Sequence, residues 1–215
     1  IEDLVSRKRL FIVGVSSLAR EIESFIDTFD KDNWEIQGFL QLFDGPSPLE
    51  GYPSDYSILG GWNTYPLNME DRCLLAITQF DWKEKVYNGL KSKTNIISYI
   101  SPHAWVGKFS SIGPGCLITG ASRLSCNVKL GKVIFINGGT QIGHDVVIGD
   151  YSTIYSQVQI GGKCLIGERV SIGSCAVIMP GIKIGDGATV GTGSVVIKNV
   201  KPGVTVFGNP AKSIM

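Results

Sequence analysis

Aliphatic residues recur at every sixth position along the second half of the chain. Stepping by six from Val106 to Val196, all sixteen positions hold Ile, Leu or Val, and Gly follows directly at ten of them. Four residues beyond the aliphatic position there is usually another small or β-branched residue, such as Cys116 or Cys164. A period of six matches neither an α-helix (about 3.6) nor an alternating strand (about 2). It predicts short, flat β-segments joined by tight corners, with Gly where a Cβ would crowd the backbone.

Three such segments complete a triangular coil of eighteen residues, in which the aliphatic residues stack as an internal ladder. Sixteen hexads predict about five coils, at about 4.8 Å per rung. Cys116 and Cys164 then face the core. Asp150, Glu168 and Asp186 recur every eighteen residues and stack on one edge. We interpret these acids as solvated corner residues, with a metal site as the alternative.

The first ninety-eight residues lack the repeat and predict alternating strands and helices. Stretches 9–14, 34–40 and 73–78 are apolar enough for buried strands, and 82–92 predicts a short helix. Over 15–29, apolar residues fall on one helical face, with Ser16 or Ser17 as N-cap; they are Leu18, Ile22, Phe25, Ile26 and Phe29. The order of elements predicts a small, parallel, Rossmann-like α/β domain over 1–98. The period-six repeat predicts an all-β domain over 99–215 that is folded as a β-helix.

Gly14 ends the first predicted strand, and the helix N-terminus behind it is a potential anion site. The sequence there is Gly-Val-Ser-Ser-Leu-Ala and not the complete G-x-G-x-x-G of a dinucleotide-binding turn. A phosphate site that includes Ser16 and Ser17 and a plain strand–helix turn therefore both remain open.

Composition narrows the classes of partner. The net charge of +1 gives no sign of a nucleic-acid partner, and no apolar run approaches the roughly 18 to 20 residues of a membrane span. The five cysteines are odd in number and contain no C-x-x-C motif. The charged start of the chain has no apolar leader region, so we expect a cytoplasmic protein.

A histidine interrupts the monotonous repeat at His144, and the chain has only one other. Residues eighteen apart stack on successive rungs, which places Cys126 below His144 and Gly162 above it. The ring lies at a corner and should point outward, beside Asp145. An outward imidazole is often only a surface residue, but here its neighbours favour a base that takes a proton from an amine or hydroxyl nucleophile.

Several stretches together resemble a known group of enzymes. They are LFIVGVSSLARE, ILGGWNTY, ISPHAWVG, INGGTQIGHDVVIGD, IGSCAVIMPGIKIG and VFGNPAK, and they span nearly the full chain. The chain is similar to the sialic-acid O-acetyltransferase family and its nucleotide-amino-sugar N-acetyltransferase relatives, the bacillosamine and perosamine pathway enzymes.

The resemblance implies a left-handed parallel β-helix, acetyl-CoA as acetyl donor, direct attack by the amine of a nucleotide-linked sugar, and no metal. It makes His144 the general base, with Asp145 orienting it and Asn137 bordering the acceptor. The nucleotide of the acceptor would lie near Gly14, Ser16, Ser17 and Asp44. The donor would follow Gly162 and Ser174 along its pantetheine arm, Gly191 and Thr192 further along, and Pro210 and Lys212 near its nucleotide end.

The chain departs from the family pattern at three places. Thr153 stands where many members have a second histidine, nine residues after the base. Ser16, Ser17 and Leu18 replace the last two glycines and the histidine of the usual glycine-rich loop. Acids that commonly follow the second strand are missing, and Asp44 is the nearest. These changes leave undetermined which nucleotide the acceptor carries and whether the altered loop binds one. They do not affect the residues assigned to acetyl transfer.

Alternatives to sugar N-acetylation remain. O-acetylation of sialic acid or another glycan needs the same base, and Cys126 beside His144 could instead carry the acetyl group. A non-catalytic β-helix scaffold is the alternative from a different class. We also predict a homotrimer, because mixed and often apolar residues should face outward around 136–162, where packing of three prisms would cover them; they are Phe135, Val147, Tyr151 and Tyr155.

Overall fold

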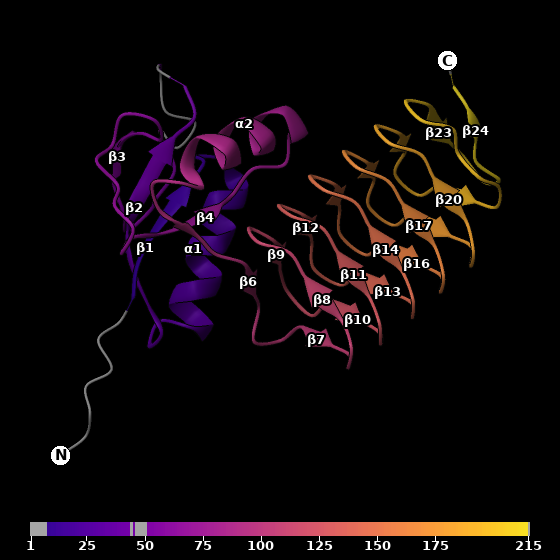
Figure 1. The fold of residues 1–215 in the computed structure, drawn as a ribbon, viewed down its shortest axis with the longest axis horizontal. Helices are drawn as coiled ribbons and strands as arrows, with labels where there is room; N and C mark the ends of the chain where they lie inside the picture. Colours follow the sequence, from indigo (N-terminus) through magenta and orange to yellow (C-terminus); the bar gives the residue numbers. More distant parts are fainter. Residues whose placement is uncertain (1–7, 44, 46–50, 215) are drawn as a thin grey trace. The chain divides into compact units, whose positions relative to one another are not determined.

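The computed structural model describes residues 8–43, 45 and 51–214. The chain divides into two compact units (Figure 1). The first contains residues 1–77 and 85–97, and the second contains residues 78–84 and 98–215.

The first unit is built on a five-stranded parallel sheet with the strand order β3-β2-β1-β4-β5. Its strands are β1 (Lys8–Val13), β2 (Trp34–Gln41), β3 (Ile58–Gly61), β4 (Arg72–Leu75) and β5 (Asn95–Ile96). The three predicted strands and the parallel α/β class are confirmed. Strands β3 and β5 were not predicted, because one ends in two glycines and the other has only two residues.

Helix α1 (Ser17–Phe29) follows β1 and buries the predicted face only in part. Leu18, Ile22 and Ile26 are buried. Phe29 was expected on that face, but it is the last helical residue and is 47% exposed, so this part of the prediction is wrong. Ser16 is the N-cap, with extended backbone and no side-chain capping hydrogen bond.

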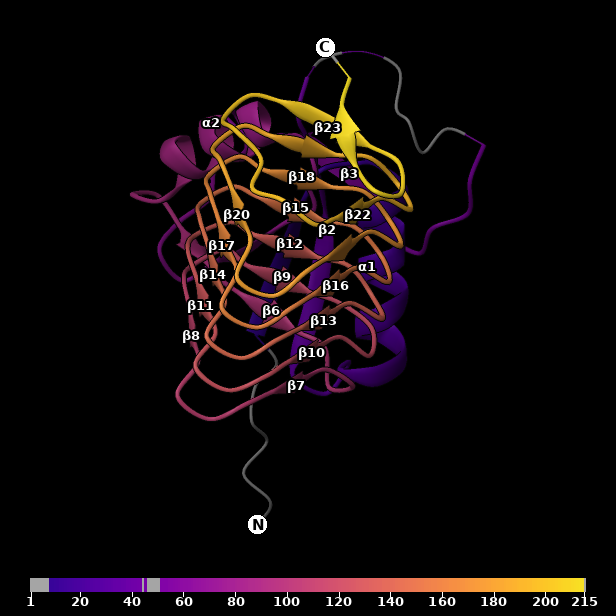
Figure 2. The ribbon, with the colours of Figure 1, turned by 90° about the vertical axis from the view of Figure 1, so that its right-hand side faces the viewer.

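The second unit is a parallel β-solenoid in which each coil contributes one short strand to each of three sheets (Figure 2). The first sheet contains β6 (Tyr99–Ile100), β9 (Leu117–Ile118), β12 (Phe135–Ile136), β15 (Thr153–Ile154), β18 (Ser171–Ile172), β21 (Thr189–Val190), β23 (Thr205–Phe207) and the antiparallel β24 (Lys212–Ser213). The second contains β7 (Trp105–Val106), β10 (Arg123–Leu124), β13 (Gln141–Ile142), β16 (Gln159–Ile160), β19 (Val177–Ile178) and β22 (Val195–Val196). The third contains β8 (Ser111–Ile112), β11 (Lys129–Leu130), β14 (Val147–Ile148), β17 (Leu165–Ile166) and β20 (Lys183–Ile184).

The repeat explains the register of these sheets. From β6 to β22, partners across each ladder are eighteen residues apart, as in Ile136 with Ile154. From β7 to β22, the second residue of each strand faces the core. The predicted aliphatic ladder is confirmed; Val106 and Ile112, in the first coil, are only partly buried. Small residues between the aliphatic ones are buried too, and their side chains donate to carbonyls fifteen residues ahead, as Cys116 does to Gly131. The interior therefore holds few polar groups, and these are paired.

The acids predicted at one edge act as corner caps. Asp150 Oδ1 accepts from the backbone N–H of Lys132 (2.9 Å), and Asp186 Oδ1 accepts from that of Glu168 (2.9 Å). Asp150 also forms an ion pair with the Lys132 ammonium at 2.8 Å. These contacts support the interpretation as corner residues.

Helix α2 (Phe80–Leu90) begins in the second unit, where Lys83 anchors its first turn. The Lys83 ammonium is buried and donates to Tyr151 O (3.2 Å), Ser152 O (2.8 Å) and Thr153 Oγ1 (2.7 Å). The Thr153 hydroxyl in turn donates to Thr78 O (2.8 Å). The Thr153 hydroxyl thus joins Lys83 and Thr78 to this rung. Burial lowers the pKa of Lys83 to about 7.

The outward apolar surface expected around 136–162 is smaller than predicted. Phe135 is 2% exposed and Tyr151 is 4% exposed within the single chain. Tyr151 is covered because its backbone lies beneath Lys83 and its ring faces the Lys132 ammonium at 5.3 Å. Of the four residues on which the trimer was argued, only Val147 (37%) is classed as exposed. Within the single chain, these residues therefore do not form the apolar surface from which the trimer was predicted.

Candidate functional site

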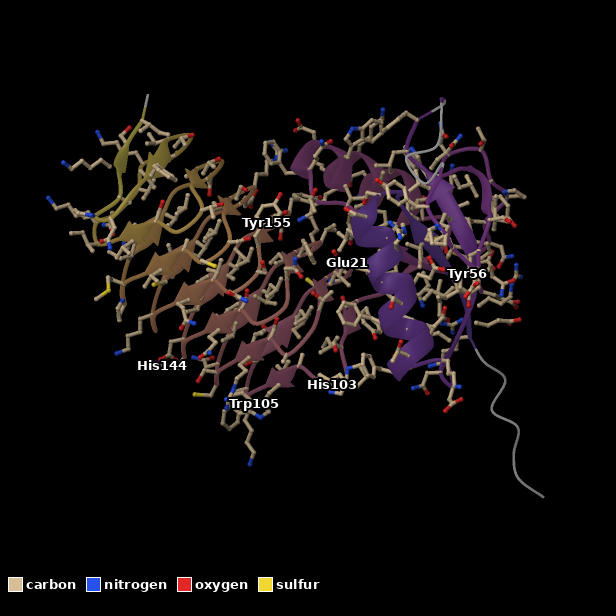
Figure 3. The ribbon with its side chains drawn as sticks, turned by 180° about the vertical axis from the view of Figure 1, so that it is seen from behind. Glu21, Tyr56, His103, Trp105, His144 and Tyr155 are labelled. Atoms are coloured by element: carbon tan, nitrogen blue, oxygen red, sulfur yellow. The ribbon has the colours of Figure 1, made fainter. Side chains whose placement is uncertain are left out.

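His144 and Asp145 form a hydrogen-bonded pair at the corner between β13 and β14. Figure 3 labels His144 on the solenoid. Asp145 Oδ2 lies 2.7 Å from His144 Nδ1, and the two side chains are 54% and 40% exposed. Asp145 has a φ of +60°, a conformation that Asp tolerates better than most residues. The tight corner thus turns the carboxylate back toward the neighbouring ring.

The carboxylate determines which imidazole nitrogen is free. Asp145 can only accept a hydrogen bond when ionised, so in the neutral ring the proton lies on Nδ1 and Nε2 keeps its lone pair. The second carboxylate oxygen accepts from Asn127 Nδ2 at 2.7 Å. Hydrogen bonds from Asn127 and from His144 hold the pKa of Asp145 below its usual value, so the carboxylate stays ionised. The pair is arranged as a base with an orienting acid.

Gly162 lies one rung above His144 and leaves room for its ring. A Cβ at position 162 would be 2.7 Å from His144 Nε2 and 2.9 Å from Cε1. The backbone of Gly162 does not have the positive φ that would itself demand glycine. The glycine is therefore explained by the ring that it accommodates.

Cys126 lies one rung below His144, where the backbone N–H of Asp145 donates to Cys126 O (3.1 Å). Its thiol is free and exposed, as is that of Cys175. The other cysteines are buried, as predicted for Cys116 and Cys164. Burial raises the pKa of Cys116 to about 11 and also raises that of Cys164, so these thiols stay protonated.

Apart from Asp145 and Gly162, the predicted site residues of the solenoid do not share an edge with His144. Gly162 follows β16, on the same edge as His144, whereas Asn137 and Ser174 lie between strands of the first and second sheets, on the opposite margin of the second sheet. Gly191 and Thr192 belong to that margin as well. Figure 3 shows the separation, because Tyr155, one rung above Asn137, lies away from His144.

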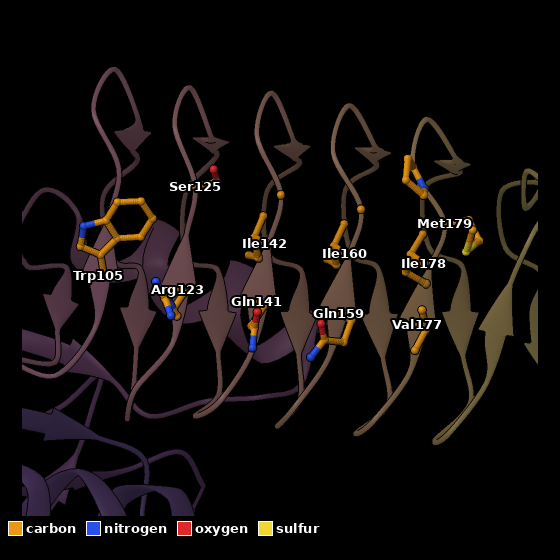
Figure 4. A pocket seen from close by; sticks show the side chains of 13 residues that line it. Trp105, Arg123, Ser125, Gln141, Ile142, Gln159, Ile160, Val177, Ile178 and Met179 are labelled. Carbon is orange, nitrogen blue, oxygen red and sulfur yellow. The ribbon is translucent and has the colours of Figure 1, made fainter.

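Between these two edges, the outer face of the second sheet carries a groove of about 550 Å³ (Figure 4). Its outward side chains come from the first residue of each strand; they are Trp105, Arg123, Gln141, Gln159 and Val177. Arg123 lies over the Trp105 ring, 5.7 Å from its centroid. Gly143, Gly161 and Pro180 border the groove on the His144 side. The five outward strand residues were not predicted to line a groove, although the hexad pattern places each of them one position before an inward aliphatic residue.

The residues expected along the far part of the donor lie at the C-terminal end of the solenoid. A Cβ at Gly191 would lie 2.3 Å from Phe207 Cδ2, so packing alone accounts for this glycine. Pro210 and Lys212 are exposed. Lys198 and Lys201 border a separate hollow of about 440 Å³ with apolar walls.

In the first unit, Gly14 has a φ of +120°, and a Cβ there would be 2.6 Å from Ala76 O. The turn therefore requires glycine whether or not an anion binds. Ser16 and Ser17 are exposed at the N-terminus of α1. Asp44 lies outside the described residues.

A second polar cluster in this unit was not predicted. Glu23, Asp27 and Asp55 bring carboxylate oxygens within 4.8 Å of one another. Ser54 Oγ donates to Glu23 (2.9 Å) and Tyr56 Oη donates to Asp27 (2.9 Å). Burial and the hydrogen bond to Asp27 raise the pKa of Tyr56 to about 12. These contacts tie the loop around residue 55 to α1.

Among the described residues, no helix has both the length and the apolarity to cross a bilayer.

The repeat is also recognised by comparison with known families. Residues 163–198 match the family described as "Bacterial transferase hexapeptide (six repeats)". A comparison with curated proteins gave no match. The matched residues lie within the second unit.

Solved structures share the fold of the whole chain. The acetyltransferase domain of PglB from Neisseria gonorrhoeae, in complex with acetyl coenzyme A, aligns with a TM-score of 0.87 and 20% identity over 97% of this chain and 100% of that one. A mutant of perosamine N-acetyltransferase from Caulobacter crescentus, in complex with CoA and GDP-perosamine, aligns with a TM-score of 0.82 and 20% identity over 96% of each chain. WeeI from Acinetobacter baumannii gives 0.59 and 22%, over 95% and 99%. The resemblance to hexapeptide-repeat acetyltransferases is thus confirmed in repeat and fold.

Proposed function

We propose that this chain is an acetyl-CoA-dependent acetyltransferase that acetylates the amino group of a nucleotide-linked amino sugar. The observation that carries the proposal is the exposed His144 ring, whose Nδ1 is hydrogen-bonded to Asp145 and whose Nε2 lies beside the backbone of Gly162. His144 follows Gly143, which lines the groove of about 550 Å³ on the outer face of the second sheet.

The transfer would proceed by direct attack. As the sugar nitrogen bonds to the thioester carbonyl carbon, His144 Nε2 takes a proton from the amine. The carbon–sulfur bond then breaks, and the imidazolium returns the proton to the departing sulfur, which leaves as the CoA thiol. Asp145 keeps the ring in the required tautomer and stabilises its charged form. The reaction therefore needs no reactant besides the two substrates, and the imidazole only carries the proton from the amine to the sulfur.

The donor-side assignment extends along the solenoid. Acetyl-CoA would place its thioester near His144 and Gly162 and its pantetheine arm near Ser174, continuing past Gly191 and Thr192. Pro210 and Lys212 would lie near its nucleotide. The exposed lysines at the C-terminal end support this direction, because CoA carries phosphates there. Two of the structurally similar proteins were solved with acetyl coenzyme A or CoA.

The division of these residues between two edges favours a shared site. His144 and Gly162 lie on one margin of the second sheet, while Asn137, Ser174 and Thr192 lie on the other. In a homotrimer with closed cyclic symmetry, the His144 edge of one chain would face the Asn137 edge of its neighbour. Each of three equivalent clefts would then contain a full set of residues.

The acceptor's nucleotide is assigned to the first unit. Gly14 forms the turn before α1, and the exposed Ser16 and Ser17 place hydroxyls at the N-terminus of that helix, where a phosphate is stabilised. Asp44 remains the predicted acidic residue of this site. The perosamine enzyme was solved with a GDP-linked amino sugar, which supports this class of acceptor. Use of acetyl-CoA as donor fits a cytoplasmic site of action.

The test is a panel of acceptors supplied with acetyl-CoA: UDP-, GDP- and dTDP-linked amino sugars and free sialic acid, with release of CoA and the mass of the product as readouts. We expect an N-acetylated nucleotide sugar. Turnover of sialic acid alone would replace this proposal with O-acetylation, and no acceptor-dependent release from any of them would favour a non-catalytic scaffold.

A further inference from the structure

At the corner that contains His144, the residue after it belongs to a column in which residues eighteen apart stack on successive rungs. Asn127, Asp145, Lys163 and Gly181 follow one another at intervals of eighteen, all with positive φ, at +56°, +60°, +61° and +74°. Backbone hydrogen bonds join the rungs, from Asp145 N–H to Cys126 O and from Lys163 N–H to His144 O (2.8 Å). The repeat thus holds Asn127 directly beneath the carboxylate that orients the base.

Asn127 makes a specific contact with that carboxylate. Its Nδ2 donates to Asp145 Oδ1 at 2.7 Å, while Oδ2 of the same carboxylate lies 2.7 Å from His144 Nδ1. The amide cannot be reversed without placing two acceptors against each other, so Asn127 is the donor. With one oxygen fixed from below, the carboxylate cannot rotate without losing a hydrogen bond. Its other oxygen is therefore directed at the ring.

We propose that Asn127 is a positioning residue for the His144 base: it holds Asp145 in the rotamer that keeps the proton on Nδ1 and leaves Nε2 free. This inference rests on the proposed function for its effect on rate, but its effect on the ring exists without substrate. Asn127 touches neither reacting atoms nor the ring, so it acts through Asp145. Lys163, one rung above, places a positive charge beside the same carboxylate and also helps to keep it ionised.

A purely conformational role is the competing explanation. Asn adopts positive φ more readily than most residues, so position 127 could require Asn for its backbone alone. Two substitutions separate the roles. Asn127→Gly and Asn127→Asp both accept positive φ, but glycine removes the donor and aspartate replaces it with an acceptor. If only the backbone mattered, both variants would behave as the wild type.

The chain has only two histidines, which makes the ring directly observable. Nitrogen-15 NMR of histidine-labelled protein, with the His144 signals assigned by their loss in His144→Asn, reports the tautomer without any substrate. We expect the Nδ1–H form in the wild type and a mixture of tautomers in both Asn127 variants. Phe109→Gly is the matched control, because Phe109 lies one rung below Asn127 with a φ of +64° and is 85% exposed.

The kinetic readout follows on the acceptor identified by the panel. We expect kcat to fall about tenfold in both Asn127 variants, the lower end of the effect of one hydrogen bond to a charged group, with KM for acetyl-CoA unchanged. Phe109→Gly should match the wild type in both measurements. An unchanged tautomer in the Asn127 variants would overturn the inference, and so would an active enzyme whose kcat they leave unaltered. A shifted tautomer in a protein that acetylates nothing would instead uphold the positioning role and refute the proposed function.

Discussion

Substitution of Gly162 by alanine tests whether the His144 ring must lie where the structure places it. The new Cβ would be 2.7 Å from Nε2, 2.9 Å from Cε1 and 3.1 Å from Cδ2. Ordinary contacts begin at 3.4 Å, so the ring must move by about 0.7 Å, which is 3.4 minus 2.7. A shift of that size lengthens the 2.7 Å hydrogen bond to Asp145 toward the limit of hydrogen bonding.

The expected result is a loss of rate without a loss of fold. Misplacement of a catalytic group by about 1 Å can cost about 100-fold, so we expect kcat to fall by roughly 10- to 100-fold. Stability should change little, because the only side chain displaced is exposed and Gly→Ala at an ordinary φ lowers the entropy of the unfolded chain. Initial rates and thermal melting measure the two effects.

The matched control is the same substitution in a His144→Ala background. Without the ring there is nothing for the new methyl group to displace, so Gly162→Ala should leave the residual rate of His144→Ala unchanged. An equal loss of rate in both backgrounds would show that Gly162 acts independently of the ring. Full activity in the single variant would show that the position of the ring is not critical, and either result would refute the reasoning.

Three further predictions concern the thiol, the assembly and the buried lysine. Cys126→Ser should keep most of the activity and give intersecting initial-rate lines, whereas parallel lines with an acetylated Cys126 would establish a covalent route. Light scattering should give about three times the chain mass of 23.2 kDa; a monomer that retains full specific activity on dilution would contradict the shared site. Burial lowers the pKa of Lys83 from 10.5 to about 7, so the folded chain binds fewer protons there than the unfolded chain between these values. Relative to Lys83→Met, the wild type should therefore gain stability as pH rises from about 7 to about 10, by at most about 1.4 kcal/mol per pH unit, and parallel melting profiles of the two proteins across this window would disprove it.

The solenoid was predictable because one spacing encodes it. A period of six fixes both the inward ladder and the eighteen-residue stacking, so the neighbours of His144 at Cys126 and Gly162 follow from arithmetic. The same arithmetic could have found Asn127, which is eighteen residues before Asp145. It also separates Asn137 and Ser174 from the His144 edge, although the family resemblance groups all of them at one site.

Other features depend on contacts that no spacing contains. Lys83 lies in a short helix, and the sequence pattern predicts a solvent-exposed side chain. Its ammonium instead donates to three oxygens of a rung that is distant in sequence. Tyr151, whose carbonyl is one of these oxygens, is buried, although the repeat alone places it on an exposed surface. Phe29 is a converse case, since helical periodicity assigns it to the buried face but the helix ends there.

The most direct test of the account is the rate of acetyl transfer by His144→Asn, measured beside the affinity for acetyl-CoA. If His144 is the general base, kcat falls by about 10²- to 10⁴-fold. Donor binding and the melting temperature stay near those of the wild type, because the ring is 54% exposed. A variant that transfers acetyl groups at nearly the wild-type rate would remove His144 from the mechanism and contradict the central claim.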